Sequence, residues 1–214
     1  FCANQEAVEK FTLDKPALIC RWRMSNKKVP MLNRHIRALS ERLVQGEPLT
    51  HNMLSWAKQH VEWSLAEGDY TAHDGVLMLV IDINGNAAMT VGEYEPLADT
   101  SAKALRARSA EARSEADETG VAPELLAAVN DGELAFVAPA DECLCGTATL
   151  IEQLAQTKGI PVTRVDIPAQ LKGALFLVSD EHGVVPATET DAAEADAATV
   201  AFFADGYEKL RARR

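Results

Sequence analysis

The segment from Gly146 to Pro186 constrains the fold more than any other part of the chain, because each of its breaks has a physical reason. Apolar residues at helical spacing follow Thr147 or Thr149, either of which could cap a first turn, and Gly159 stands where a helix ends in a left-handed residue. The sequence IPVTRVDI then alternates like a half-buried strand, and after a short helical step the apolar run ALFLV is short enough for a buried strand. This segment therefore predicts helix, strand, short helix and strand.

The composition indicates an acidic globular protein. A length of 214 residues with 47% hydrophobic content is enough for one large domain or two modest ones. The net charge of −11 argues against nucleic acid as a partner, because binding a polyanion needs clustered Lys and Arg. No apolar run approaches the roughly 20 residues of a membrane helix, and we recognise no signal peptide, so we expect a cytoplasmic protein without a membrane partner.

The four cysteines do not indicate a disulfide framework in a chain of this length. Cys143 and Cys145 form one Cys-x-Cys pair with no matching cluster of His or Cys elsewhere. A structural zinc site needs about four such ligands, so we expect no metal.

The first part of the chain predicts a small α+β domain over residues 1–97. The sequence ALICRWRM alternates like a strand and ends in a turn at Ser25–Lys28, and LNRHIRALSERLV has one apolar helical face. Residues 50–65 predict a second helix. Two more alternating strands flank Asn84-Gly85-Asn86, a hairpin signal because Asn-Gly supplies the positive φ angles of tight turns. We expect a mixed or antiparallel sheet here.

The rest of the chain predicts a larger α/β domain over residues 98–214. Residues 100–118 form a charged, alanine-rich helix that Ser101 can cap. At the other end, residues 191–214 form a polar linker that merges into a helix, whose apolar side carries Val200, Phe203 and Tyr207.

The joints of the segment from Gly146 to Pro186 resemble the class IV pyridoxal-phosphate enzymes, the branched-chain and D-amino acid aminotransferases and aminodeoxychorismate lyases. In that family a Gly-Ile-Thr loop opens the helix, and its backbone N–H groups bind the cofactor phosphate, as helix N-termini bind other anions. Here that loop is Cys145-Gly146-Thr147, the family's "GIPV" is found at 159–162, and a second phosphate-side loop runs from Ser179 to Pro186. The resemblance implies an α+β, two-domain fold type IV protein with pyridoxal 5'-phosphate, whose phosphate contacts Gly146, Thr147 and Ser179.

The resemblance also implies roles for two residues of the helix over 100–118. Lys103 lies just after the expected interdomain connection, where the family has its Schiff-base lysine. That amine forms an imine with the cofactor aldehyde and later moves a proton at the substrate Cα. Glu118, in Glu118-Thr119-Gly120, resembles the glutamate that pairs with the pyridine nitrogen. The alternative for Lys103 is an ordinary surface lysine.

Three features depart from the family. His35 matches its His-x-x-Arg-Leu pattern, but the phosphate-binding arginine falls on Ala38, so Arg37 or Arg34 would have to reach the phosphate by another path or lie on a solvated helix face. Asp180 would repel a phosphate. The strand pair that the family has between the lysine and the glutamate is absent between Lys103 and Glu118, so either the protein has lost it or the sequence joins residues across a missing loop.

From the resemblance we expect a pyridoxal-phosphate-dependent lyase similar to aminodeoxychorismate lyase, which releases 4-aminobenzoate and pyruvate. We expect it to act on a small-molecule substrate as a homodimer. A class IV aminotransferase that acts on a small amino acid would use the same residues. The three departures favour another alternative, a degenerate non-catalytic member that acts as a binding or interaction module.

Overall fold

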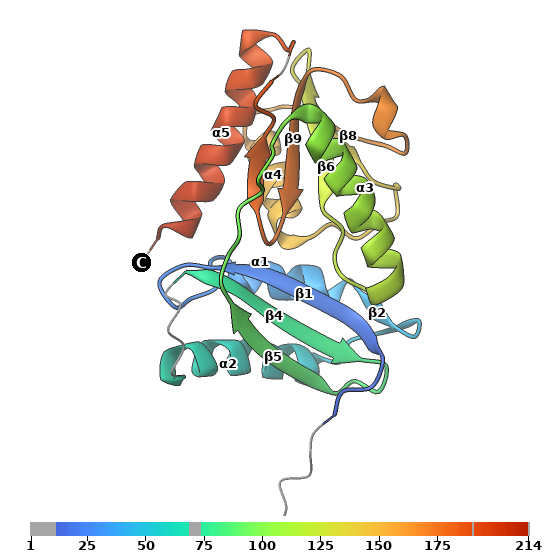
Figure 1. Cartoon of the computed structure of the whole chain (residues 1–214), viewed down its shortest axis with the longest axis vertical. Coiled ribbons are helices and arrows are strands. Elements are labelled where there is room, and N and C mark those ends of the chain that lie inside the picture. Colours follow the sequence, from blue (N-terminus) through green and yellow to red (C-terminus); the bar gives the residue numbers. More distant parts are fainter. Residues whose placement is uncertain (1–11, 69–73, 190, 214) are drawn as a thin grey trace, which may run out of the picture.

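The computed structural model of the protein describes residues 12–68, 74–189 and 191–213. Figure 1 shows a lower part built on one sheet and an upper part built on a second. The lower sheet is antiparallel in the order β1-β4-β5, as the sequence predicts for the first domain. Its elements are β1 (Pro16–Met24), α1 (Leu32–Ser40), β2 (Leu43–Val44), β3 (Glu47–Pro48), α2 (His51–Glu67), β4 (Gly75–Asp82) and β5 (Ala87–Gly92).

The upper sheet has five strands in the order β10-β9-β6-β7-β8, and only the β7–β8 pair is parallel. Its strands are β6 (Leu125–Asn130), β7 (Glu133–Val137), β8 (Val162–Val165), β9 (Ala174–Ser179) and β10 (Gly183–Pro186). Its helices are α3 (Ala102–Thr119), α4 (Gly146–Thr157), the short 3₁₀ helix η1 (Pro168–Gln170) and α5 (Glu194–Arg211). None of the described helices is long and apolar enough to cross a membrane.

Helices cover both faces of the upper sheet, which explains its continuous apolar strands. On one face, Ile151 of α4 and Phe203 of α5 pack with Phe136 and Phe176 of the sheet. On the other face, Leu105 of α3 packs with residues of β6 and β9. The lower sheet has its own core, in which α1 and α2 pack against the inward side chains of β1 and β4.

Local sequence signals predict several boundaries correctly. Thr50 caps α2 by accepting a hydrogen bond from Met53 N, and Ser101 caps α3 through Ala104 N, both at 3.2 Å. Gly159 follows the end of α4 with a φ of 71°, the left-handed conformation expected there.

Other boundaries differ from the prediction. The first helix ends at Ser40 instead of Val44, because Gln45 and Gly46 take positive φ angles that form the tight β2–β3 turn. Cys145 is the N-cap residue of α4 without a side-chain hydrogen bond, so neither Thr147 nor Thr149 caps it. Thr149 instead donates its hydroxyl to Gly146 O, inside the first turn.

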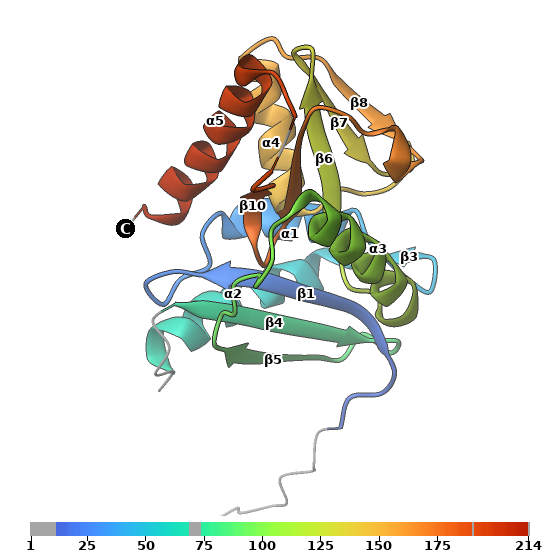
Figure 2. The same cartoon turned by 45° about the horizontal axis from the view of Figure 1, so that its top comes forward.

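The two parts are joined along β1, which contacts the end of α3 and the β9–β10 turn, and where α1 meets α4. Arg23 N donates to Asp180 O at 2.9 Å, and Ile19 N donates to Gly120 O at 3.1 Å. Gly120 has a φ of 72°, and a Cβ there would lie 1.8 Å from Ala17 O, so only glycine allows this approach. Helix α1 packs against α4 at the same boundary (Figure 2).

Candidate functional site

A cavity of about 40 Å³ lies where the two parts meet. It holds on the order of three waters at roughly 10–15 Å³ each. Four segments surround it: β1, α1, the C-terminal half of α3 with the loop that follows, and the β9–β10 turn beside the start of α4. Apart from three cysteines, its charged or ionisable lining residues are Arg21, His35, Arg42, Glu115, Glu124, Asp180 and Glu181.

Asp180 is the centre of the site. Its Oδ1 accepts a hydrogen bond from Thr147 N at 2.8 Å, at the N-terminus of α4, and its Oδ2 lies 3.3 Å from His35 Nδ1. A carboxylate in this position is stabilised by the N–H groups and the positive end of the helix dipole. The carboxylate therefore occupies the anion position that the family resemblance assigns to a cofactor phosphate.

The electrostatics of the site keep Asp180 ionised. Burial acts to raise its pKa, but the electrostatic interaction with His35 and the hydrogen bond from Thr147 N outweigh burial and lower the pKa to about 2. The opposite holds for the two buried thiols that line the cavity. Burial raises the pKa of Cys20 to about 12, and burial together with Asp180 raises the pKa of Cys145 well above its usual value. Neither cysteine is a thiolate nucleophile at neutral pH.

His35 is held from three sides, by Trp22, Asp180 and Gly146. Its ring stacks on Trp22 with centroids 5.4 Å apart and an interplanar angle of 22°, and its side chain is 3% exposed. On the third side lies Gly146, where an added Cβ would be 2.5 Å from His35 Nδ1. Thr147 is fully buried next to this pair, and its hydroxyl has no hydrogen-bond partner among the described residues.

Replacing Gly146 with alanine is expected to lower the free energy of unfolding by about 2 kcal/mol, because His35 would have to leave its place between Trp22 and Asp180. Urea unfolding of the purified variant measures this change. Gly92→Ala is the matched control, since nothing lies within 4 Å of its added Cβ and its φ is not positive. Equal stability of the two variants would contradict the tight contact.

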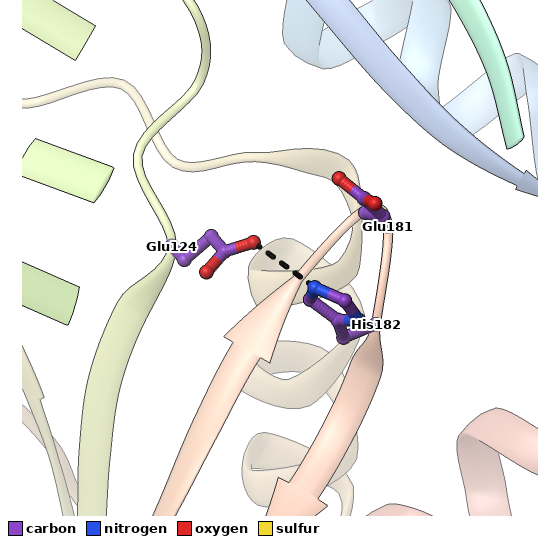
Figure 3. A group of neighbouring side chains, drawn as sticks. All are labelled: Glu124, Glu181 and His182. Atoms are coloured by element: carbon purple, nitrogen blue, oxygen red, sulfur yellow. Dashed lines mark ion pairs between the residues drawn. The ribbon is translucent and has the colours of Figure 1, made fainter. Parts of the chain in front are cut away.

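A second group of polar side chains lies at the edge of the cavity (Figure 3). Glu124, from the loop between α3 and β6, lies with Oε1 3.5 Å from Nε2 of His182 in the β9–β10 turn. Arg108 of α3 holds the same carboxylate, with Nε 2.6 Å from Oε2 and Nη2 3.1 Å from Oε1. Glu181, next to His182, completes a set of three ligand-type atoms within 4.8 Å of one another.

The imidazole of His182 is fixed in orientation. Its Nδ1 lies 3.2 Å from the hydroxyl of Tyr94, and its backbone N donates to Ser179 Oγ at 2.9 Å. The Tyr94 ring in turn packs under the guanidinium of Arg23, whose Cζ is 3.2 Å from the ring centroid. Burial lowers the pKa of His182, while the nearby Glu124 carboxylate acts in the opposite direction.

The structure brings together three of the six site residues proposed from the sequence. Gly146, Thr147 and Ser179 all lie at the junction of α4 with the β9–β10 turn. Arg37 is exposed on α1 and borders a separate surface depression, whereas Ala38 lines the cavity.

Lys103 and Glu118 are both exposed on α3, one in its first turn and one in its last. Because α3 is continuous, their separation of 15 positions along the helix places their backbones about 22 Å apart. The two side chains therefore cannot both contact one pyridine ring of a bound cofactor. The strand pair β6–β7 exists but follows α3, so it is indeed absent between Lys103 and Glu118.

Sequence reasoning did not propose Glu124, Glu181, Arg108 or Tyr94 as site residues. The polar run Ser179–His182 between a buried strand and Gly183 was the available signal for part of this group. Glu124 gave no such signal, because only the β6–β9 pairing brings it near His182.

Comparison with solved structures identifies the fold. A hypothetical aminotransferase from Mycobacterium tuberculosis in its PLP-bound form is 12% identical, with a TM-score of 0.60 and coverage of 95% of each chain. A fold IV transaminase from Curtobacterium pusillum is 16% identical, with a TM-score of 0.58 and coverage of 92% of this chain and 86% of that one. A protein described as a 4-amino-4-deoxychorismate lyase from Legionella pneumophila is 11% identical, with a TM-score of 0.57 and coverage of 92% and 97%.

The chain thus has the fold type IV architecture of the pyridoxal-phosphate aminotransferases and aminodeoxychorismate lyases, as the sequence resemblance implies. These neighbours support pyridoxal phosphate as the cofactor that belongs to this fold. No protein-family model matches the sequence, and no curated protein matches it.

Proposed function

We propose that this protein is a non-catalytic member of fold type IV that acts as a binding module. The single observation that carries the proposal is the contact of Asp180 with Thr147 N, because an internal carboxylate takes the N–H group that a cofactor phosphate would need. A phosphate carries the same sign of charge, and Asp180 would repel it at close range in a buried site.

The other lining residues of the cavity fit pyridoxal phosphate no better. None of the lysines in the described part of the chain lines it, so no amine is placed there to form an imine with an aldehyde. Ala38 ends at its Cβ where the family pattern has a phosphate-binding arginine. The volume of about 40 Å³ is also far below the roughly 300–1,000 Å³ of most ligand pockets.

The alternative proposal is a pyridoxal-phosphate-dependent lyase resembling aminodeoxychorismate lyase, or a class IV aminotransferase. The assignments of the structural neighbours favour it. It would need Lys103 as the imine-forming residue, and therefore a rearrangement that brings the start of α3 to the cavity. The homodimer and the cytoplasmic location remain predictions under either function.

The test is the absorbance spectrum of the protein after incubation with pyridoxal phosphate and dialysis, measured beside Lys103→Ala. We expect no retained band of a protonated internal aldimine in either protein. Lys103→Ala is a suitable comparison because the side chain is exposed and its loss leaves the core intact. A stoichiometric band in the wild type that disappears in the variant would overturn the proposal and establish the alternative.

A further inference from the structure

We propose that Glu124, Glu181 and His182 bind a divalent transition-metal ion, best matched by Zn²⁺, at the edge of the cavity. The proposal rests on the binding-module function and gives that module a ligand class. Its starting point is the presence of one imidazole nitrogen and two carboxylate oxygens within 4.8 Å of one another (Figure 3).

The spacing of these atoms is close to that of a zinc site. Bonds of about 2.0–2.1 Å in tetrahedral geometry place neighbouring ligand atoms about 3.3 Å apart. His182 Nε2 and Glu124 Oε1 are already 3.5 Å apart. Glu181 is half-buried at the tip of the turn, and Figure 3 shows its side chain close to the other two. One of its carboxylate oxygens already lies within 4.8 Å of the other two ligand atoms.

The groups around the ligands are those that orient metal-binding side chains. A metal-bound histidine uses its other ring nitrogen to bond a neighbouring acceptor, and here Nδ1 of His182 is paired with the Tyr94 hydroxyl. That pairing leaves Nε2 directed at Glu124, with no hydrogen bond to it from any described residue. Arg108 donates to both oxygens of Glu124, more closely to Oε2, and Oε1 keeps a second lone pair that can bind a cation.

The charges and the position of the cluster also suit a divalent cation. Glu124 and Glu181 give the group two carboxylates, and Arg108 pairs directly with one of them. A mixed nitrogen and oxygen ligand set favours Zn²⁺ and its transition-metal neighbours over Mg²⁺ and Ca²⁺. Three protein ligands leave a fourth position open, and Glu124 and Glu181 both line the cavity, where a water could complete the coordination.

The experiment is titration of the metal-stripped, full-length protein with Zn²⁺ by calorimetry, and with Co²⁺ by absorbance as a spectroscopic substitute. We expect one ion per chain and visible Co²⁺ bands without the strong thiolate charge-transfer bands of a cysteine site. His182→Gln and Glu124→Gln should each weaken binding more than about 100-fold, since loss of a mere orienting group already costs about 10–100-fold. Tyr94→Phe, which removes only the orienting hydroxyl, should weaken binding about 10-fold or more.

Two control variants separate this site from adventitious binding. Glu115→Gln removes another carboxylate of the same cavity, one paired with Arg21, and should change the affinity less than threefold. Cys143→Ser removes the exposed thiol and should also leave the affinity unchanged. Circular dichroism confirms that each variant is folded, and Glu181→Gln at the half-buried turn serves as the ligand variant of least structural risk.

Two outcomes would overturn the metal site: no stoichiometric binding by the wild type, or unchanged affinity in folded His182→Gln and Glu181→Gln. Neither outcome affects the proposed function, which the pyridoxal-phosphate spectrum of the same samples tests separately. A retained aldimine band would overturn that function whether or not Zn²⁺ binds.

Discussion

Replacement of Asp180 with alanine is expected to lower the free energy of unfolding by about 3 kcal/mol, as measured by urea unfolding at neutral pH. The variant leaves His35 and the N–H group of Thr147 buried without their partner. An unsatisfied buried polar group costs about 1–3 kcal/mol, and this variant leaves two of them. Water that enters the small cavity would solvate part of these groups and so reduce the total loss of unfolding free energy.

Asp180→Asn separates the charge from the hydrogen bond. The amide oxygen can still accept from Thr147 N, but the group no longer carries the negative charge that faces His35. We therefore expect a smaller loss of about 1–2 kcal/mol. Asp141→Asn, at an exposed position in the loop before α4, is the control and should lie within about 0.5 kcal/mol of the wild type. Equal stabilities of Asp180→Ala and the wild type would contradict a stabilising role of this carboxylate.

The same contact makes a definite contribution to the pH dependence of stability. The pKa of Asp180 is about 2 in the folded protein, against an ordinary value of 3.8. Because the folded-state value is the lower one, the unfolded chain binds the proton more readily. The stabilisation is thus complete above pH about 4 and is lost as the pH falls to about 2. The shift corresponds to about 2 kcal/mol of unfolding free energy. Asp180→Asn should lack this contribution, so its free energy of unfolding should fall less than that of the wild type between pH about 4 and about 2.

The sequence predicted the elements whose ends depend on local chemistry. Thr50 and Ser101 begin their helices, Gly159 ends another, and Asn84-Gly85 forms the β4–β5 turn, because caps and positive φ angles need particular residues nearby. The end of α1 was harder to predict from the sequence, since LNRHIRALSERLV keeps a helical pattern beyond Ser40. There the tight turn at Gln45 and Gly46 overrides the pattern.

The site was predicted only in part, because its chemistry depends on segments far apart in the chain. The sequence marked Asp180 as incompatible with a phosphate, but not that its carboxylate binds Thr147 N. It also placed Lys103 and Glu118 by their order along the chain. In the structure one continuous helix separates them, and the side chains that do meet, from Glu124 and His182, are joined through strand pairing.

Replacement of Arg108 with methionine is expected to lower the free energy of unfolding by about 3 kcal/mol in the metal-free protein. Methionine retains most of the aliphatic length, so the change removes mainly the charge and the two hydrogen bonds to Glu124. The Glu124 side chain is 8% exposed, and its carboxylate would remain buried beside His182 without the guanidinium. A buried charge without a partner lowers the free energy of unfolding, because neither water nor an opposite charge compensates its burial.

A double-mutant cycle with Glu124→Gln measures the pair directly. Glu124→Gln alone should cost less, about 1–2 kcal/mol, because the Arg108 side chain is 33% exposed and water can solvate the unpaired guanidinium. The double variant should be more stable than the sum of the single losses predicts, with a coupling energy of about 1.5–3 kcal/mol.

If a divalent cation binds the same carboxylate, Zn²⁺ should recover more stability in Arg108→Met than in the wild type, because the cation takes the place of the missing positive charge. Additive single losses would show that Arg108 and Glu124 contribute independently, and an Arg108→Met stability within about 0.5 kcal/mol of the wild type would contradict the buried ion pair.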